Sequence, residues 1–239
     1  MTTVRPFDSS SACSACHPGR TRQGARENRK MTKPIDEPSP IYGTGARGLQ
    51  DELGTRRLAD WVAKRTVHSE LTDDDRALIR AQSSVLVSTV DADGWPDVSY
   101  KGGDIGFVEI VGRTELRLPI YDGNGMMRTM GNIIDTGRIA LLFVDTSRPW
   151  RLRLQGDAIV STAAVDTARH HGADAVVIVT LRRAFPNCGR YIHRDDTISE
   201  YVPREGTEPP LPDWKRYDEV SDALRPADQA RLAAETSDR

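Results

Sequence analysis

The feature that most constrains this chain is a series of short segments rich in β-branched residues and separated by tight turns. Residues 84–90 read Ser-Val-Leu-Val-Ser-Thr-Val, and the Asp91-Ala92-Asp93-Gly94 turn leads into a returning segment at Trp95–Tyr100. β-Branched residues favour strands, and a short Asp- and Gly-containing turn between two such runs favours a hairpin. Further extended segments are expected at Phe107–Val111, Thr114–Ile120, Arg138–Asp145, Arg151–Val160 and Ala173–Leu181.

Helical patterns between these segments are short. Gly125–Asp135 predicts a short helix, and a polar helix is expected near Ala163–His171. Because tight turns join most of the strands, they favour a closed antiparallel barrel over a doubly wound parallel sheet. The predicted fold class is therefore mainly β (α+β), a six-stranded antiparallel barrel with peripheral helices.

The regions on either side of the barrel have a different composition. Residues 1–40 contain almost no large apolar residue, which predicts a disordered tail. Cys13-Ser14-Ala15-Cys16-His17 inside it has the spacing of covalent haem attachment, which we interpret as a chance match. Apolar residues recur at helical spacing over Gly48–Arg65, and Thr72 is the expected N-cap of a second helix. The expected organisation is a tail at 1–40, helices at 41–82, the barrel domain at 83–200 and a Pro-rich and helical tail at 201–239.

Charge and hydropathy exclude several classes of partner. The chain has 33 Lys and Arg residues against 35 Asp and Glu residues, so no global field recruits nucleic acid or an anionic membrane. The longest apolar runs have strand length, and the N-terminus lacks the apolar core of a secretory signal. Three cysteines are too few for a disulfide framework. We expect a cytoplasmic protein with a small-molecule substrate.

Within Val98–Asn132, a strand punctuated by polar residues is followed by a strand pair and a short helix, so two strand ends and one helix start are expected to converge there. The helix start follows Gly123-Asn124-Gly125, and Lys101 and Arg128 supply cations. Unpaired N–H groups at a helix start and charged side chains together bind phosphate. This stretch is thus a candidate phosphate site; the alternative is an ordinary turn with a solvated arginine.

Three other groups of residues are candidates for chemistry. His170 and His171 are adjacent on a predicted helix and point in different directions, so no metal site is expected. Cys188 and His193 lack a third, orienting group, which argues against a thiol nucleophile. Tyr191 and His193 alternate along a predicted strand and therefore share one face, where they are candidate substrate contacts.

The order of these segments resembles the pyridoxamine 5'-phosphate oxidase-like split-barrel FMN-binding proteins. The resemblance covers about Leu71 to Arg194 and depends on order and spacing together, since no single piece is diagnostic. The segments that carry it are residues 91–103, Gly123-Asn124-Gly125, Gly131-Asn132-Ile133, Ala140-Leu141-Leu142-Phe143, Arg151-Leu152-Arg153-Leu154-Gln155-Gly156 and Pro186-Asn187-Cys188.

The resemblance implies a six-stranded split barrel and a homodimer with FMN in each of two interface clefts. It also implies the cofactor-binding residues, which are Ser99, Tyr100 and Lys101 on the second strand, Arg128 at the helix start with Asn124 and Asn132 beside it, and Gln155 near the flavin ring.

The chain departs from the family pattern in two places. Met127-Arg128-Thr129 stands where the oxidases usually have Ser-Arg-Lys, so one cation is missing. The oxidases' C-terminal Arg-x-His segment has no counterpart after Trp214, which argues against pyridoxamine 5'-phosphate as the substrate.

The function that the resemblance implies is an FMN-dependent oxidoreductase acting on an unidentified small molecule. The flavin carries the redox chemistry in such proteins, so the sequence demands no dedicated acid–base residue and none is assigned. Two alternatives remain open at this point. One is a deazaflavin-dependent reductase on the same barrel, and the other is a non-catalytic flavin- or haem-binding module.

Overall fold

The computed structural model describes residues 41–193 and 197–237. The expected disordered tail at 1–40, with its Cys13–His17 motif, lies outside the described residues. Within the described part, no helix combines the length and the apolar character needed to cross a membrane.

The core of the molecule is one antiparallel sheet whose strands follow each other in the order β2-β1-β5-β6-β7-β4-β3. The mainly antiparallel fold with peripheral helices is therefore as predicted, but the described chain has seven strands where six were expected. All seven strands fall on segments that the sequence predicts to be extended. The short β3 lies within the segment expected at Phe107–Val111, and it pairs with β4 across the Gly112 turn, where φ is +73°. The strands are β1 (Ser84–Val90), β2 (Pro96–Gly102), β3 (Glu109–Val111), β4 (Glu115–Tyr121), β5 (Arg138–Asp145), β6 (Trp150–Ser161) and β7 (Ala173–Asn187).

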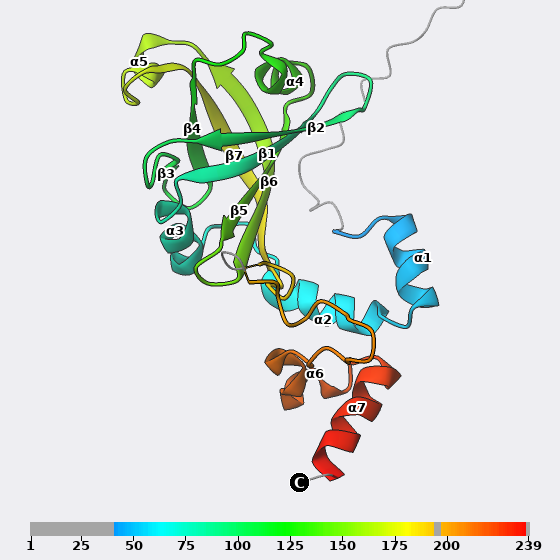
Figure 1. Cartoon of the computed structure of the whole chain (residues 1–239). Coiled ribbons are helices and arrows are strands. Elements are labelled where there is room, and N and C mark those ends of the chain that lie inside the picture. Colours follow the sequence, from blue (N-terminus) through cyan, green and yellow to red (C-terminus); the bar gives the residue numbers. More distant parts are fainter. Residues whose placement is uncertain (1–40, 194–196, 238–239) are drawn as a thin grey trace, which may run out of the picture. The chain divides into compact units, whose positions relative to one another are not determined.

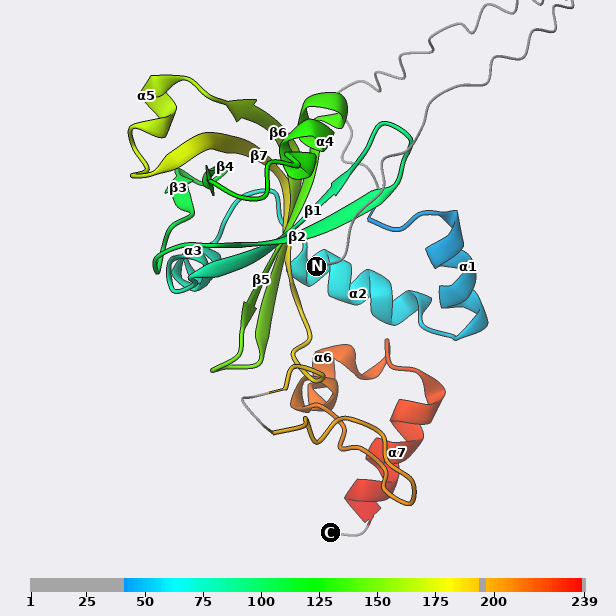
Figure 2. The ribbon, with the colours of Figure 1, turned by 45° about the horizontal axis from the view of Figure 1, so that its top comes forward.

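The sheet is curled, with β1 and β2 crossing the direction of β6 and β7 (Figures 1 and 2). Alternate residues of each strand point into the curl and form the core, because side chains alternate between the two faces of a strand. Phe143, Leu116, Leu118 and Leu154 are among the fully buried side chains. The other face of the sheet, called the outer face below, carries the less buried residues of the same strands.

Three helices precede the sheet: α1 (Thr44–Glu52), α2 (Arg56–Thr66) and α3 (Asp73–Arg80). The single helix expected over Gly48–Arg65 is thus two helices, separated where Gly54 has a φ of +62°. The predicted N-cap at Thr72 is confirmed. Its hydroxyl accepts from the backbone N–H of Asp75 at 3.1 Å, and the Asp75 carboxylate accepts from the N–H of Thr72 at 2.9 Å.

Two short helices lie between strands of the sheet. Helix α4 (Arg128–Thr136) begins three residues later than the expected Gly125, because Gly125 and Met127 both have positive φ angles. It contacts β1, β2, β5 and β6. Helix α5 (Ala164–Thr167) is shorter than expected and packs on β7.

The C-terminal part contains a 3-10 helix, η1 (Asp213–Arg216), and the helices α6 (Asp218–Ser221) and α7 (Pro226–Ser237). A buried ion pair joins η1 to α7, with 2.6 Å between Lys215 Nζ and Asp228 Oδ2. Burial raises the pKa of Asp228, but hydrogen bonds from Arg225 and Lys215 outweigh it, so the pKa lies below its usual value.

Candidate functional site

A hollow of about 250 Å³ opens where β2, the end of β4 and the start of α4 meet, and we call it the cradle. It therefore lies where the sequence placed the candidate phosphate site. Four of the predicted cofactor-binding residues line it: Ser99, Lys101, Asn124 and Arg128. The other lining residues are Asp97, Val98, Ile120, Tyr121, Gly123, Gly125, Met126, Met127, Thr129, Met130 and Asp174.

Strand β2 supplies the polar floor of the cradle through its alternation. Asp97, Ser99 and Lys101 are each two residues apart and are partly buried on one face. Tyr100 lies between them in sequence and points to the outer face, where 68% of its surface is exposed. Tyr100 is consequently separated from Ser99 and Lys101, with which the resemblance had grouped it.

The start of α4 forms the opposite wall of the cradle, and no side chain caps it. Met127, at the N-cap position, has a φ of +53° and is the one described non-glycine residue with a positive φ. Non-glycine residues pay for this conformation and are found in it mainly at functional sites. The first N–H groups of a helix have no intrahelical acceptor, so those of α4 are available to a ligand.

Two hydroxyl groups connect these walls. Ser99 Oγ on β2 and Thr129 Oγ1 on α4 are 3.0 Å apart, within hydrogen-bond distance. Each hydroxyl has further donor or acceptor capacity after this bond. The pair thus holds the helix start against the strand and presents polar groups to the cradle.

The charges in the cradle are balanced. Lys101 and Arg128 supply two cations, whereas Asp97 and Asp174 supply two carboxylates. Arg128 Nε lies 3.6 Å from Asp97 Oδ1, and this partner restrains the guanidinium group. No hydrogen bond or ion pair joins the Lys101 ammonium group to another described residue. An anionic ligand in the cradle would therefore meet Arg128, which is already paired with Asp97, and Lys101, which has no charged partner among the described residues.

The two predicted asparagines have different roles in the structure. Asn124 lines the cradle, and its Oδ1 accepts from the Met126 N–H at 3.0 Å. Asn132 is buried and its Nδ2 donates to Thr89 Oγ1 at 3.0 Å. Asn132 therefore fastens α4 to β1 and does not line the cradle.

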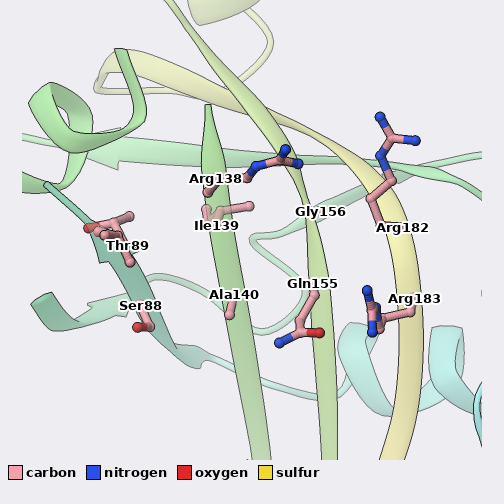
Figure 3. A pocket seen from close by; sticks show the side chains of 10 residues that line it. Ser88, Thr89, Arg138, Ile139, Ala140, Gln155, Gly156, Arg182 and Arg183 are labelled. Atoms are coloured by element: carbon pink, nitrogen blue, oxygen red, sulfur yellow. The ribbon is translucent and has the colours of Figure 1, made fainter. Parts of the chain in front are cut away.

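Gln155 lies in a second hollow, on the outer face of the sheet, which we call the outer hollow (Figure 3). It measures about 370 Å³. Gln155 is thus not brought together with the predicted phosphate-binding residues within one protomer. The outer hollow is lined by Ser88, Thr89, Val90, Arg138, Ile139, Ala140, Gln155, Gly156, Arg182 and Arg183.

The predicted substrate contacts, Tyr191 and His193, are not on a strand. Strand β7 ends at Asn187, and both residues lie in the turn region that follows, so the expectation of a shared strand face is wrong. His193 Nδ1 accepts from the N–H of Ser199 at 3.2 Å, and neither residue lines the cradle or the outer hollow. The strand stops because β6 begins at Trp150, so pairing ends with Arg151 opposite Asn187 and the residues after Asn187 have no partner on β6.

Sequence reasoning missed two features of the cradle. Asp97 is two residues before Ser99, so the period of a strand was a sufficient signal for its place on the same face. The left-handed Met127 has no signal in the sequence, because the flanking Gly125 is the residue type expected to take that conformation. For metals, the described residues contain no group of three or more His, Cys, Asp or Glu side chains that could hold an ion.

The fold and the cradle define a class, the antiparallel split barrels, and comparison with known proteins identifies the family. Residues 71–184 match the family model described as pyridoxamine 5'-phosphate oxidase. The barrel of this chain therefore matches the pyridoxamine 5'-phosphate oxidase-like family. No match was found among curated proteins.

Several solved structures are similar to the barrel. HupZ from Group A Streptococcus is 26% identical, with a TM-score of 0.40, and the match covers 48% of this chain and 93% of that one. An FMN-binding protein from Syntrophomonas wolfei is 13% identical, with a TM-score of 0.38 and coverage of 60% and 95%. An F420 reductase is 16% identical, with a TM-score of 0.33 and coverage of 49% and 97%.

Proposed function

We propose that this protein is an FMN-dependent oxidoreductase that acts on a small molecule as a homodimer. The observation that carries the proposal is the cradle, in a chain whose barrel matches the pyridoxamine 5'-phosphate oxidase-like family. An uncapped helix start, two hydroxyl groups and two cations meet there.

The residues of the cradle fit the phosphate of FMN. Lys101 and Arg128 would donate charge-assisted hydrogen bonds, which are the strong kind. Ser99 and Thr129 would donate from their hydroxyls once they turn toward the ligand. The first N–H groups of α4 add the positive end of the helix dipole, and this supports an anion even where Asp97 and Asp174 offset the side-chain charges.

The chemistry of the reaction would come from the isoalloxazine ring, which accepts and returns a hydride or electrons. The protein's contribution is to bind and orient the cofactor. Lys101 and Arg128 would anchor its phosphate end, and the Asp97 carboxylate beside Arg128 would weaken the attraction of that guanidinium group for the anion. Tyr121 and Met126 supply apolar surface at the edge of the same hollow.

The size of the cradle supports a dimeric site. Its volume of about 250 Å³ in one protomer is below the roughly 300–1,000 Å³ of ordinary cofactor pockets, so a second surface is needed to enclose the ligand. The outer face supplies a candidate interface. Tyr100 and Val98 are exposed there to 68% and 65%, and Leu86 pairs with both Tyr100 and Leu142 across the strands. We propose that a second copy covers this apolar face.

The test is to identify what copurifies with the full chain. We expect flavin absorbance bands, FMN in the mass spectrum of the released ligand, and turnover with a reduced nicotinamide and an electron acceptor. A deazaflavin spectrum would show that the cofactor is a deazaflavin and not FMN. A Soret band would show that it is haem. Protein that binds none of these after incubation with excess FMN would refute the proposal.

The dimer has its own test. Sedimentation of the wild-type protein should give twice the chain mass of 26.5 kDa. Tyr100→Glu places a charge at the centre of the proposed interface and should give the monomer mass, whereas Trp95→Glu, in the hairpin turn, is the exposed control. Wild-type protein that sediments as a monomer at micromolar concentration would contradict the dimer.

A further inference from the structure

The outer hollow contains three arginines (Figure 3). It shares no lining residue with the cradle. Arg138 comes from β5, and Arg182 and Arg183 come from β7. The remaining polar side chains of its lining are those of Gln155, Ser88 and Thr89. None of these arginines takes part in the arrangement proposed for FMN.

Strand pairing builds this hollow across four neighbouring strands. Ser88 on β1 pairs with Ala140 on β5, Ala140 pairs with Gln155 on β6, and Gln155 pairs with Arg183 on β7. Paired residues of adjacent strands point to the same face of a sheet, so their side chains form a continuous row. The row ends with a guanidinium group beside the amide of Gln155.

A β-bulge directs two consecutive arginines toward this face. Gln155 pairs with Arg183 but Gly156 pairs with Leu181, which leaves Arg182 as the extra residue. Leu181 and Ala184 on either side are buried, whereas Arg182 is exposed and Arg183 is partly exposed. Strict alternation would send one of the two arginines into the core, and the bulge avoids this. Bulges occur often next to functional sites, where they redirect a side chain.

Close packing of the two strands holds the bulge in place. A Cβ atom on Gly156 would lie 2.4 Å from the carbonyl oxygen of Thr180. Glycine is therefore needed there for β6 to approach β7. The position of the arginines is thus built into the backbone of the sheet.

The charges of the hollow are not balanced. Asp157 forms ion pairs with both Arg138 and Arg182, so one carboxylate serves two guanidinium groups. The Arg183 side chain makes no ion pair and no hydrogen bond with the residues that the structure describes. Guanidinium groups bind carboxylate and phosphate in a planar, two-pronged geometry. An oxyanion in the hollow would remove the repulsion among the three arginines and meet the Gln155 amide.

We propose that the outer hollow is a binding site for a small organic anion that carries carboxylate or phosphate groups. Arg183 is the main donor, Arg138 and Arg182 are the flanking cations, and Gln155 orients the ligand by its amide. The site's volume of about 370 Å³ suits a molecule of metabolite size. This inference does not depend on FMN binding in the cradle, since the two hollows have no lining residue in common. It does require the outer hollow to stay open beside the apolar surface of Leu86, Val98 and Tyr100 that the proposed second copy covers.

Isothermal titration calorimetry on the full chain saturated with FMN, which keeps the cradle occupied, tests the site with two probes, citrate for carboxylates and inorganic pyrophosphate for phosphates, at constant ionic strength. We expect one probe or both to bind once per chain, and the stronger probe identifies the class of anion. Arg183→Gln should weaken binding by about 10-fold or more, the effect of losing a charged hydrogen bond. Arg138→Gln should weaken it less, because Asp157 already engages that arginine.

Two matched variants make the result specific. Arg57→Gln removes the same charge from an exposed position of α2, and Arg204→Gln removes it from an exposed position beyond β7; both should bind the probe as wild type does. FMN content is measured in parallel and should be unchanged in Arg183→Gln. The proposal is overturned if neither probe binds, if Arg183→Gln binds like wild type, if a control variant loses as much affinity, or if Arg183→Gln loses FMN.

Discussion

The cradle and the outer hollow both contain arginine, but they differ in how far nearby carboxylates balance its charge. In the cradle, Arg128 has the nearby carboxylate of Asp97, and the positive end of α4 completes the anion site. In the outer hollow, Arg138 and Arg182 share the single carboxylate of Asp157, and Arg183 has no ion-pair partner among the described residues. The cradle thus depends on backbone N–H groups as much as on side chains, whereas the outer hollow depends on side chains placed by a bulge.

This difference has a consequence for mutation. Backbone donors cannot be removed by substituting a side chain, so the cradle should lose affinity stepwise. A site made of side chains on a bulge should be sensitive to any change that alters the bulge.

The largest effect is expected from Gly156→Ala. The added Cβ would meet the Thr180 carbonyl oxygen at 2.4 Å, so β6 and β7 must separate locally. Overpacking of this kind costs about 1–3 kcal/mol of unfolding free energy, and contact with rigid backbone places this variant near the upper end. Urea denaturation measures the change, with Gly45→Ala as the control because no atom lies within 4 Å of its Cβ position. Wild-type stability in Gly156→Ala would show that the bulge adapts freely.

Lys101→Ala and Arg128→Ala should each weaken FMN binding by about 1.5–3 kcal/mol, the range for a charged hydrogen bond. Stability should change little, because both side chains lie at the surface of the cradle. Fluorescence titration of the apoprotein with FMN gives the dissociation constants. Arg183→Gln is the matched control from the outer hollow. If both cradle variants keep wild-type affinity, the phosphate of FMN does not lie in the cradle.

Asn132→Ala tests whether Asn132 has a structural role, in contrast to Asn124, which lines the cradle. The substitution leaves the buried Thr89 hydroxyl without its donor, which should cost about 1–3 kcal/mol of unfolding free energy. Asn124→Ala, at an exposed position, should leave stability unchanged. Thermal denaturation of both apoproteins measures the difference. Equal stability of the two variants would mean that the bond to Thr89 contributes nothing.

The smallest effect is expected from Asp97→Asn. Removing this carboxylate reduces the negative charge of the cradle, so FMN affinity should rise by about 0.3–1 kcal/mol, as for a partly exposed ion pair. The effect should shrink as salt is added. A fall in affinity in the same titration would instead show that Asp97 acts mainly by holding Arg128 in position.

Local chemistry explains which predictions agree with the structure. The Thr72 N-cap is confirmed because Asp75 follows at the third helical position and completes the hydrogen-bond exchange within four residues. Ser99 and Lys101 share the cradle because strand alternation places residues two apart on one face. Tyr100 was grouped with them by the resemblance, and the same alternation puts it on the outer face.

Predictions failed where the outcome depended on contacts between distant segments. Tyr191 and His193 have a strand-like spacing, but β7 loses its partner before reaching them. Asn132 follows the cradle closely in sequence, yet the packing of α4 on β1 turns it toward Thr89. The adjacent Arg182 and Arg183 carry no sign of their shared face, because a bulge depends on the register of two strands.

The sequence by itself determined the strands, their turns, the helix cap and the residues that supply charge to the cradle. These follow from propensity, alternation and hydrogen bonds among near neighbours, which act over a few residues. Only the tertiary structure decided that Gln155 belongs to a different hollow from Lys101, and that three arginines gather on the outer face. The reason is that strand register and sheet curvature place residues far apart in sequence, and both are settled by the packing of the whole sheet.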